Sequence, residues 1–483
     1  MGAAVRSAAL AAPPPPRFSL RALAWIALAE LLLVLVGWKL ESFVWPLVGA
    51  LGIVYALVAY RAPEAAWLLV WIAIPFSREV LTPLGAAFSV PTEPMMAIAL
   101  AVWSFKRWPW RDLSFGPRSI AKPLAVVAAL ALFSVALSHF PVAGLKAWVM
   151  AALYAAFGYF YFVSTGSDAR RLKRWLAAGV VLASALSIYA SVRVLASNVA
   201  FHVAYGAARP FFLEHGTFAA YLAFFLPPAI VESLSKERGA RWLWALGAGV
   251  ILAGIVLSFT RAAWLSVVVV VPFLLAVWTV GRGGAARLWL PLSIVGIVAL
   301  GIGWSKLSDP LSRHARSIVT PENVSNLERL NRWMAAAEMT RARPLTGVGY
   351  GVYPEEYREF RRKSIVTEQS LVVFGVHNEL LRMLAETGWP GLAASLWFVA
   401  AVAAAGLRAF ARDPGSDRGR LALGLTCGLA TYGVHGLFNS YLGIDKISVP
   451  FWIFIGMVAA LAMAPPHLVA VRDDDVRLTK DSP

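Results

Sequence analysis

Apolar segments of about 17 to 25 residues follow one another along most of the chain, and short polar stretches separate them. Each segment is long enough to cross the ~30 Å hydrocarbon core of a bilayer as a helix. The pattern therefore predicts an all-α fold, a polytopic bundle of 12–14 transmembrane helices, with twelve if the weak segment 64–81 and one neighbour do not cross. That segment is interrupted by Pro75 and could be re-entrant. The expected spans are 20–37, 43–60, 64–81, 91–106, 121–138, 144–163, 175–195, 215–231, 242–258, 262–280, 287–304, 389–408, 420–438 and 447–464.

One long hydrophilic stretch, residues 305–376, breaks this pattern. Its charges of both signs and its aromatic residues indicate a folded cap, with helices expected at 327–341 and 353–363. A Pro/Gly-rich turn is expected between them. The domains expected from this pattern are a disordered cytoplasmic tail at 1–19, a helical bundle at 20–304, a large loop with short helices at 305–388, C-terminal transmembrane helices at 389–464 and a cytoplasmic tail at 465–483.

The charges indicate which side of the membrane each loop faces. The chain is 59% hydrophobic and 15% charged, with an excess of 17 positive charges. A basic chain can indicate nucleic-acid binding, but here Lys and Arg cluster in short loops between apolar segments, so we expect no nucleic acid as a partner. Because cytoplasmic loops are enriched in Lys and Arg, both termini are expected inside and the large loop outside. Cys427 is the only cysteine, which excludes an intramolecular disulfide.

Three polar residues stand out on the outer side. Arg261 interrupts some 35 nearly uncharged residues, and a charge at membrane depth indicates function, although it could also be a turn residue that reaches the interface. Arg209 lies near Glu214 and His215, and these three could equally form an interfacial salt-bridge cluster. His377 is expected on the apolar face of a helix with Leu381, Leu384 and Gly388, where it could simply satisfy a backbone carbonyl.

The same helix carries Glu379, Arg382 and Glu386 on its other face, at spacings that allow their charges to pair. No Asp-x-Asp pair stands in an outer loop, and the chain has no glycine-rich phosphate loop and no His-x-x-x-His pair. A soluble nucleotide donor and a metal are therefore disfavoured, and we expect no cofactor. Arginines that face the outer leaflet suit a lipid diphosphate, and a histidine can take a proton near neutral pH.

Five motifs in this order resemble the O-antigen ligase and polymerase superfamily of bacterial envelope glycosyltransferases, with GT-C-like membrane architecture. They are RPFFLEHGTFAAYLAFFLP at 209–227, LSFTRAAWLS at 257–266, RLNRW at 329–333, RPLTGVGYGVY at 343–353 and HNELLRMLAETGWPGL at 377–392. The Pro-x-x-Gly-x-Gly turn and the His-Asn followed by Glu-x-Gly-x-x-Gly are the most specific. After Gly216 the family often has Asn-Pro-Asn, whereas this chain has Thr217, Phe218 and Ala219.

The resemblance implies a multi-pass protein of the bacterial inner membrane with a periplasmic loop and a periplasmic active site. It implies transfer of a glycan from undecaprenyl diphosphate to a lipid A core in ligases, or to another carrier-linked repeat in polymerases. Arg209 and Arg261 would hold the diphosphate, and His377 would activate the acceptor hydroxyl. Further substrate contacts are expected from Arg329, Gly347, Gly349, Asn378, Glu386 and His215.

Alternatives remain open at this point. Arg329 could serve the diphosphate or pack against Trp333. A transporter or flippase for polyprenyl lipids is the alternative from another class of protein, because charges within a membrane also mark transport paths. Membrane lipids are expected partners in either case. The ligase and the polymerase share these motifs, so the residues do not separate them.

Overall fold

The computed structural model of the chain describes residues 44–81, 87–107, 113–235, 240–281, 324–361 and 375–463. These residues form two compact units. One unit contains residues 44–70 and 91–107, and the other contains the remaining described residues. The expected spans 20–37 and 287–304 and the two terminal tails lie outside the described residues.

The smaller unit consists of α2 (Val44–Arg61), the first part of α3 (Pro63–Ala73) and α4 (Thr92–Lys106). The Tyr55 hydroxyl donates to the Ala66 carbonyl at 2.9 Å, and the Trp67 and Trp103 rings lie 6.3 Å apart. Lys106 donates to the Tyr60 carbonyl at 2.6 Å and so ties the end of α4 to the end of α2.

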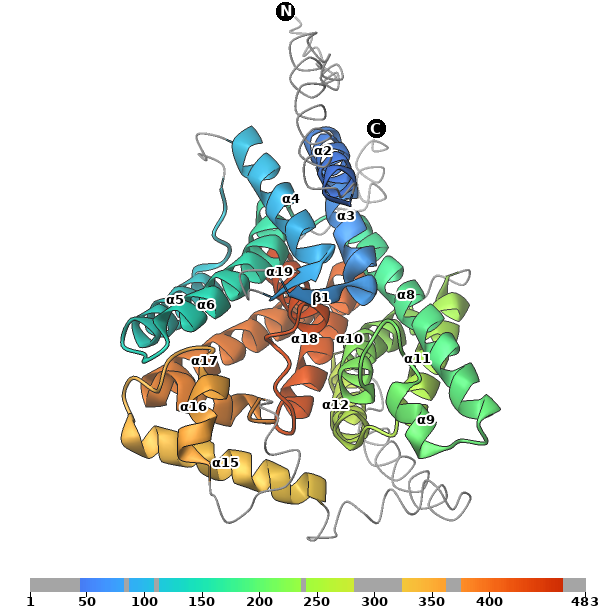
Figure 1. Ribbon diagram of the computed structural model, residues 1–483. Coiled ribbons are helices and arrows are strands. Elements are labelled where there is room, and N and C mark those ends of the chain that lie inside the picture. Colours follow the sequence, from blue (N-terminus) through green and yellow to red (C-terminus); the bar gives the residue numbers. More distant parts are fainter. Residues whose placement is uncertain are drawn as a thin grey trace, which may run out of the picture. The chain divides into compact units, whose positions relative to one another are not determined.

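The larger unit contains the remaining elements (Figure 1). They are η1 (Ile74–Phe76), β1 (Arg78–Leu81), β2 (Ala87–Val90), α5 (Arg118–Ala136), α6 (Pro141–Ala155), η2 (Ala156–Phe160), α7 (Tyr161–Thr165), α8 (Ala169–Ala196), α9 (Phe201–Gly206), α10 (His215–Ser233), α11 (Arg241–Leu257), α12 (Arg261–Val280), α15 (Val324–Ala342), α16 (Tyr353–Phe360), α17 (Glu379–Arg412), α18 (Asp417–His435) and α19 (Asp445–Met463).

The described residues hold seven helices that are long and apolar enough to cross a membrane. The prediction of an all-α, multi-pass helical protein is therefore confirmed. The continuous span expected at 64–81 is wrong, because α3 has 11 residues and ends at Ala73. Pro75 lies in the short turn η1, and the chain then enters the antiparallel pair β1–β2, in which Arg78 lies opposite Val90. An 11-residue helix is about 16 Å long, too short for a bilayer core.

Helix α10 forms the centre of the bundle. Apolar residues cover all of its faces, which is typical of a buried helix. Within its 18-residue apolar stretch, 89% of the residues are buried. It packs against α8, α11, α12, α18 and α19. Small residues allow the closest approach: a Cβ at Gly428 of α18 would lie 2.5 Å from the Phe224 carbonyl oxygen of α10. Such glycine contacts let membrane helices pack backbone to backbone.

Helix α17 is divided in two by Gly388, which has φ 68° and ψ −173° inside the run of helical residues. A residue in this conformation ends the regular helix, and the preceding part begins only at Glu379, with Asn378 as its N-cap. His377 lies before the cap and has a left-handed φ of 57°. The expectation that His377, Leu381, Leu384 and Gly388 share one helical face is therefore wrong at both ends.

The helices expected in the hydrophilic stretch exist as α15 and α16, which pack on each other and on α17. Their shared core consists of Ala335, Ala336, Met339, Val348, Val352, Tyr353, Tyr357, Val376 and Ala385. We call residues 324–361 the cap. The turn between α5 and α6 also holds the cap, because His139 Nδ1 lies 2.9 Å from Glu356 Oε1 and Arg343 donates to the Leu137 carbonyl at 3.1 Å.

Candidate functional site

Polar side chains gather at one end of the larger unit, where α10, α12 and α17 begin and α18 ends. His215 opens α10, and its Nδ1 lies 2.7 Å from the Ser258 carbonyl oxygen in the turn before α12. The Thr260 hydroxyl donates to the His215 carbonyl at 3.2 Å. These contacts fix the beginning of α10 against the beginning of α12.

Arg261 is the first residue of α12 and is half-buried. A positive side chain at a helix N-terminus is unfavourable, because the unpaired N–H groups already make that end positive. The combination nevertheless attracts anions strongly, and helix N-termini commonly bind phosphate groups. The position of Arg261 therefore suits an anionic ligand better than it suits the stability of the helix.

Two more arginines come from α15. Arg329 and Arg332 are three residues apart, so they lie on one face of the helix. Burial lowers the pKa of Arg329, and the positive charges of Arg261 and Arg332 lower it further. Arg332 is 2% exposed and donates to the Gly375 carbonyl at 3.2 Å. Three guanidinium groups from two helices thus act on one region of the site.

The carboxylate of Glu214 lies near these arginines. It acts electrostatically on Arg329 and on His215, and its Oε1 accepts a hydrogen bond from the Thr217 hydroxyl at 2.9 Å. It also accepts a hydrogen bond from Tyr441. Positive charges from two helices and the carboxylate of Glu214 thus meet in this region.

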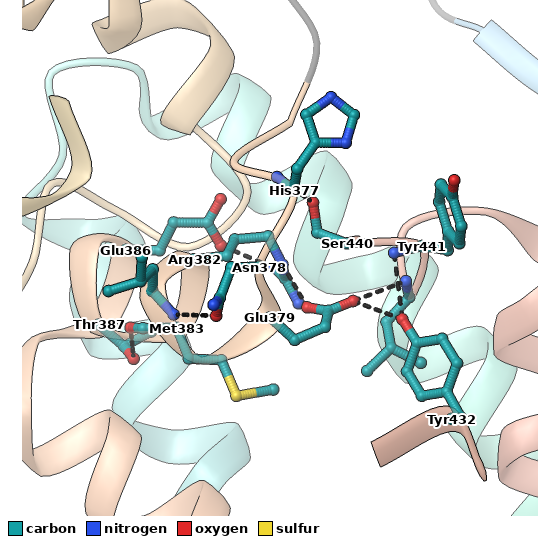
Figure 2. Close-up of polar contacts among 12 residues, drawn as sticks. His377, Asn378, Glu379, Arg382, Met383, Glu386, Thr387, Tyr432, Ser440 and Tyr441 are labelled. Atoms are coloured by element: carbon teal, nitrogen blue, oxygen red, sulfur yellow. Dashed lines mark hydrogen bonds and ion pairs between the residues drawn. The ribbon is translucent and has the colours of Figure 1, made fainter. Parts of the chain in front are cut away.

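His377 enters the site from the segment before α17. Its backbone N–H donates to the Ser440 hydroxyl at 3.2 Å, and Figure 2 shows its ring turned away from the carboxylates of Glu379 and Glu386. Burial lowers the pKa of His377 to about 4, and repulsion from Arg332 and Arg329 adds to this, whereas a hydrogen bond with Asn439 opposes it. The imidazole is therefore neutral near pH 7 and able to accept a proton.

Residues 436–444, which connect α18 to α19, hold the beginning of α17; we call them the return segment. The Glu379 N–H donates to the Gly436 carbonyl at 2.7 Å, and Asn378 Nδ2 donates to the Leu437 carbonyl at 2.9 Å. The Glu379 carboxylate accepts from the Tyr432 hydroxyl at 2.6 Å and from the Leu442 N–H at 3.0 Å (Figure 2). These contacts fix the two residues that directly follow His377.

Two of the expected substrate-binding residues make contacts that stabilise α17. Asn378 caps α17, since its Oδ1 accepts from the Leu381 N–H at 3.0 Å. Glu386 is 2% exposed, and Arg382 binds both Glu386 and Glu379, at 2.8 and 2.7 Å. The pairing of charges expected along this face of the helix is confirmed.

Gly347 and Gly349 both have positive φ, 68° and 127°. The Val348 and Gly349 N–H groups donate to the Ala385 and Glu386 carbonyls at 2.9 and 3.1 Å. A Cβ at Gly347 would lie 2.2 Å from the Glu386 carbonyl carbon. The glycines of this turn therefore allow the cap to lie directly on the backbone of α17 just before Gly388.

Arg209 lies apart from the other arginines. It is exposed, and its Nε donates to the Leu213 carbonyl in its own turn at 2.9 Å. Its charge acts on Tyr205, whose ring centroid is 5.0 Å from that of His215. Arg209 thus reaches the site only at its margin, and its catalytic role remains a prediction.

The sequence reasoning missed four residues of the site: Arg332, Asn439, Ser440 and Tyr441. Arg332 could have been found by its spacing of three from Arg329. The other three form a polar Asn-Ser-Tyr run between two apolar spans, but the resemblance to the family ends before them. In the described ranges, no group of three His, Cys, Asp or Glu side chains is placed to hold a metal ion.

The fold and the site define a multi-pass helical membrane protein with an anion-attracting cluster and a neutral histidine at one end of the bundle. Residues 246–396 match the family described as O-Antigen ligase. The resemblance is confirmed over this range, so this part of the chain is similar to the O-antigen ligase family. The matched range includes Arg261, the cap and His377 but not His215, Arg209 or the return segment. No curated protein matches the chain.

Proposed function

We propose that the protein is a glycosyltransferase that moves a glycan from undecaprenyl diphosphate to an acceptor hydroxyl, with a lipid A core as the acceptor. The observation that carries the proposal is the convergence of Arg261, Arg329 and Arg332 with a neutral His377. The arginines suit a leaving group with several negative charges, and the histidine suits a hydroxyl that must lose a proton.

The donor is inferred from the kind of charge that the site can neutralise. Arginine presents a planar fork of N–H donors that binds phosphate oxygens in pairs, and it stays protonated when burial lowers its pKa. A diphosphate that joins a lipid and a glycan carries two negative charges, which suit a region where the charges of Arg261 and Arg332 act on Arg329. Such preorganised charge favours the departing diphosphate over the intact donor.

The proposed reaction is a single displacement. The acceptor oxygen forms a bond to the anomeric carbon while the bond from that carbon to the diphosphate oxygen breaks. His377 takes the proton of the acceptor hydroxyl, and undecaprenyl diphosphate leaves with the electron pair of the broken bond. Attack opposite the leaving group inverts the anomeric centre, and these steps require protein side chains and no metal.

The proposed side of the membrane is the periplasm of a bacterial inner membrane. The end of the bundle opposite the site carries basic residues, among them Arg170, Arg171 and Arg174 in the first turns of α8, Arg412 at the end of α17 and Arg418 at the beginning of α18. Because short loops rich in arginine remain in the cytoplasm, the opposite end with the site faces outward. A carrier lipid in the outer leaflet would present its diphosphate at that level.

Substitution of the proposed base and of the anion-binding arginine tests the reaction. We expect His377→Ala to lower transfer about 10²- to 10⁴-fold, the usual contribution of a positioned base, and Arg261→Ala to lower it at least about 100-fold. The matched control is Arg341→Ala, because Arg341 lies on α15 as well but is 74% exposed and pairs with Glu338 at the surface. We expect this control to keep wild-type activity.

The measurement is transfer by purified protein in detergent, together with gel analysis of the surface glycan in a strain that lacks the gene. Lipid A core without attached chains indicates a ligase, and cores with a single repeat indicate a polymerase. Transfer in detergent excludes a pure transporter, since detergent leaves no compartments to transport between. Wild-type transfer by the His377→Ala protein would overturn the proposed site.

A further inference from the structure

Asn439 of the return segment is the centre of a buried group of polar side chains. It is 5% exposed, its Nδ2 lies 3.0 Å from Nε2 of His435, and its Oδ1 accepts from the Tyr441 hydroxyl at 3.2 Å. Since Nδ2 can only donate and Oδ1 can only accept, these two contacts determine which way the amide points. The orientation of this side chain is therefore fixed on both sides.

His435 supports that orientation from the end of α18. It is 0% exposed, and a donor at its Nε2 requires this nitrogen to be unprotonated. Its Nδ1 has no hydrogen-bond partner in the described part of the chain. The ring of His435 also lies 5.8 Å from that of Tyr441, so both neighbours of the amide pack against each other.

Tyr441 is in turn held by α10. Its single O–H lies between two acceptors, the Glu214 carboxylate and Asn439 Oδ1, and its oxygen would lie 2.4 Å from a Cβ at Gly216. Residue 216 must therefore be small for Tyr441 to reach both Glu214 and Asn439. Two elements far apart in the sequence, the beginning of α10 and the return segment, thus cooperate to orient one amide.

The amide lies next to the proposed base. Asn439 hydrogen-bonds to the His377 side chain, and the following residue, Ser440, accepts the backbone N–H of His377 at 3.2 Å. Consecutive residues of the return segment thus hold the ring and the backbone of His377. The left-handed φ of 57° at His377 gives its backbone an uncommon conformation that these contacts stabilise.

We propose that Asn439 is the positioning residue of His377: its amide oxygen accepts the N–H of one ring nitrogen and leaves the lone pair of the other for the acceptor hydroxyl. The inference rests on the proposed function, in which His377 is the base. A catalytic histidine needs such a partner, because the hydrogen bond at one nitrogen selects the tautomer and the ring orientation. Asn439 does this without adding a charge.

The surroundings of His377 explain why a neutral partner suits this site. Arg329 and Arg332 of α15 oppose a positive charge on the ring, whereas Asn439 favours it. On the other side, Tyr441 and His435 face Asn439, and Glu379 is bound by Arg382 and Tyr432. A carboxylate at position 439 would neutralise charge that the proposed donor diphosphate needs.

Two substitutions at one position separate positioning from a structural role. Asn439→Ala removes the contact that favours imidazolium, so the pKa of His377 should fall and the acid limb of the pH profile should move to lower pH. Asn439→Asp keeps the shape but adds a negative charge, so the limb should move to higher pH. In both variants we expect kcat to fall about 10- to 100-fold with the donor KM changed less than about threefold.

The experiment uses the full-length protein in detergent, donor lipid extracted from a strain that lacks the gene, and lipid A core from the same strain. Labelling of His377 by diethyl pyrocarbonate across pH, followed by mass spectrometry, gives a second readout that needs no substrate. Ser395→Ala is the matched control, since Ser395 is also buried and donates only to the Gly391 carbonyl of its own helix. Melting curves confirm that each variant is folded.

Opposite shifts for the Ala and Asp variants in both readouts would support the inference. Unchanged pH profiles and labelling midpoints in both variants, with His377→Ala inactive, would overturn it and leave the proposed function intact. If the His377→Ala protein is active, the proposed function fails. In that case opposite shifts in labelling would still establish the contact between Asn439 and His377, although its role in transfer would be lost.

Discussion

At the scale of single residues, the candidate site combines arginines whose burial is unfavourable with a histidine that is neutral near pH 7. Arg332 is 2% exposed, and Arg261 adds its charge to a helix N-terminus that is already positive. Buried charges are unfavourable unless they are paired. The proposed donor diphosphate would add negative charge beside these arginines.

After burial, the charge of Arg332 is the next cause of the lowered pKa of His377, the proposed base. Only the neutral imidazole accepts a proton, so kcat/KM falls below the pKa of His377, which is about 4 in the wild type. Arg332→Gln removes a positive neighbour and should raise this pKa, which moves the acid limb toward neutral pH. Arg332→Lys keeps the charge and should leave the limb in place.

The measurement is kcat/KM for the donor between pH 4 and 8. A limb that stays in place in Arg332→Gln would show that His377 is not the group that titrates. A limb that moves equally in both variants would assign the effect to a structural change and not to charge.

At the scale of elements, contact between backbones decides how the cap meets the bundle. The turn after α15 presents the N–H groups of Val348 and Gly349 to the carbonyls of α17, and Gly388 itself lies against the Leu345 backbone, with a Cβ distance of 2.6 Å. Side-chain packing alone would not require glycine at these positions. The Gly-rich turn is therefore a docking element for the cap.

Gly347→Ala should separate the cap from α17. The residue has φ 68°, and the new Cβ would meet the Glu386 backbone at 2.2 Å, so both strain and a clash that the backbone cannot relieve are introduced. Strain alone costs about 1–3 kcal/mol. We expect a lower melting temperature in detergent and a loss of transfer.

The control for this substitution is Gly249→Ala in α11, where no atom lies within 4 Å of the new Cβ. We expect its melting temperature to stay the same or to rise slightly, because alanine favours a helix over glycine. Equal melting temperatures for the two variants would contradict the docking role of the turn.

At the scale of the whole molecule, the two ends of the bundle in the larger unit differ in how their charged side chains are arranged. At the end without the site, Glu232 is 1% exposed and lies between Lys173 at 3.1 Å and Arg420 at 3.7 Å, and Arg420 also pairs with Asp417. That cluster binds α8, α10 and α18 together. At the site end, by contrast, the positive charges of Arg261 and Arg332 act on Arg329.

Cysteine labelling tests which end of the bundle faces the periplasm and which faces the cytoplasm. The natural Cys427 is 0% exposed and should not react, which leaves new cysteines as the only reporters. Leu345→Cys lies in the cap, at a side chain 71% exposed, and should react with a membrane-impermeant maleimide in spheroplasts. Gly415→Cys, at the exposed turn between α17 and α18, should react only after lysis. The reverse pattern would place the site in the cytoplasm.

Hydropathy predicted most spans in the described residues because long apolar segments have few alternatives in a membrane. It failed at 64–81, where the helix ends shortly before Pro75 and a short strand pair follows. Hydropathy averages over a long segment and does not detect such local features. It also continued a helix through His377 and Gly388, since periodicity does not record a left-handed residue. Spacing along a helix correctly paired Arg382 with its two carboxylates.

The site was predictable only where its residues lie on one element or within a recognised motif. Arg261 and His377, whose proposed roles remain predictions, lie in such motifs. Asn439 and Tyr441 were not, because their connection to His377 and Glu214 is made by folding across more than 60 residues and leaves no periodic pattern.

The break in α17 at Gly388 divides this helix into two segments with different contacts. The nine residues before it contact the cap and the return segment, whereas the residues after it belong to the apolar part of the helix. A helix adapts to membrane thickness by tilting. Because the regular helix ends at the break, we expect a change of tilt after Gly388 to move His377 less than it would in an unbroken helix.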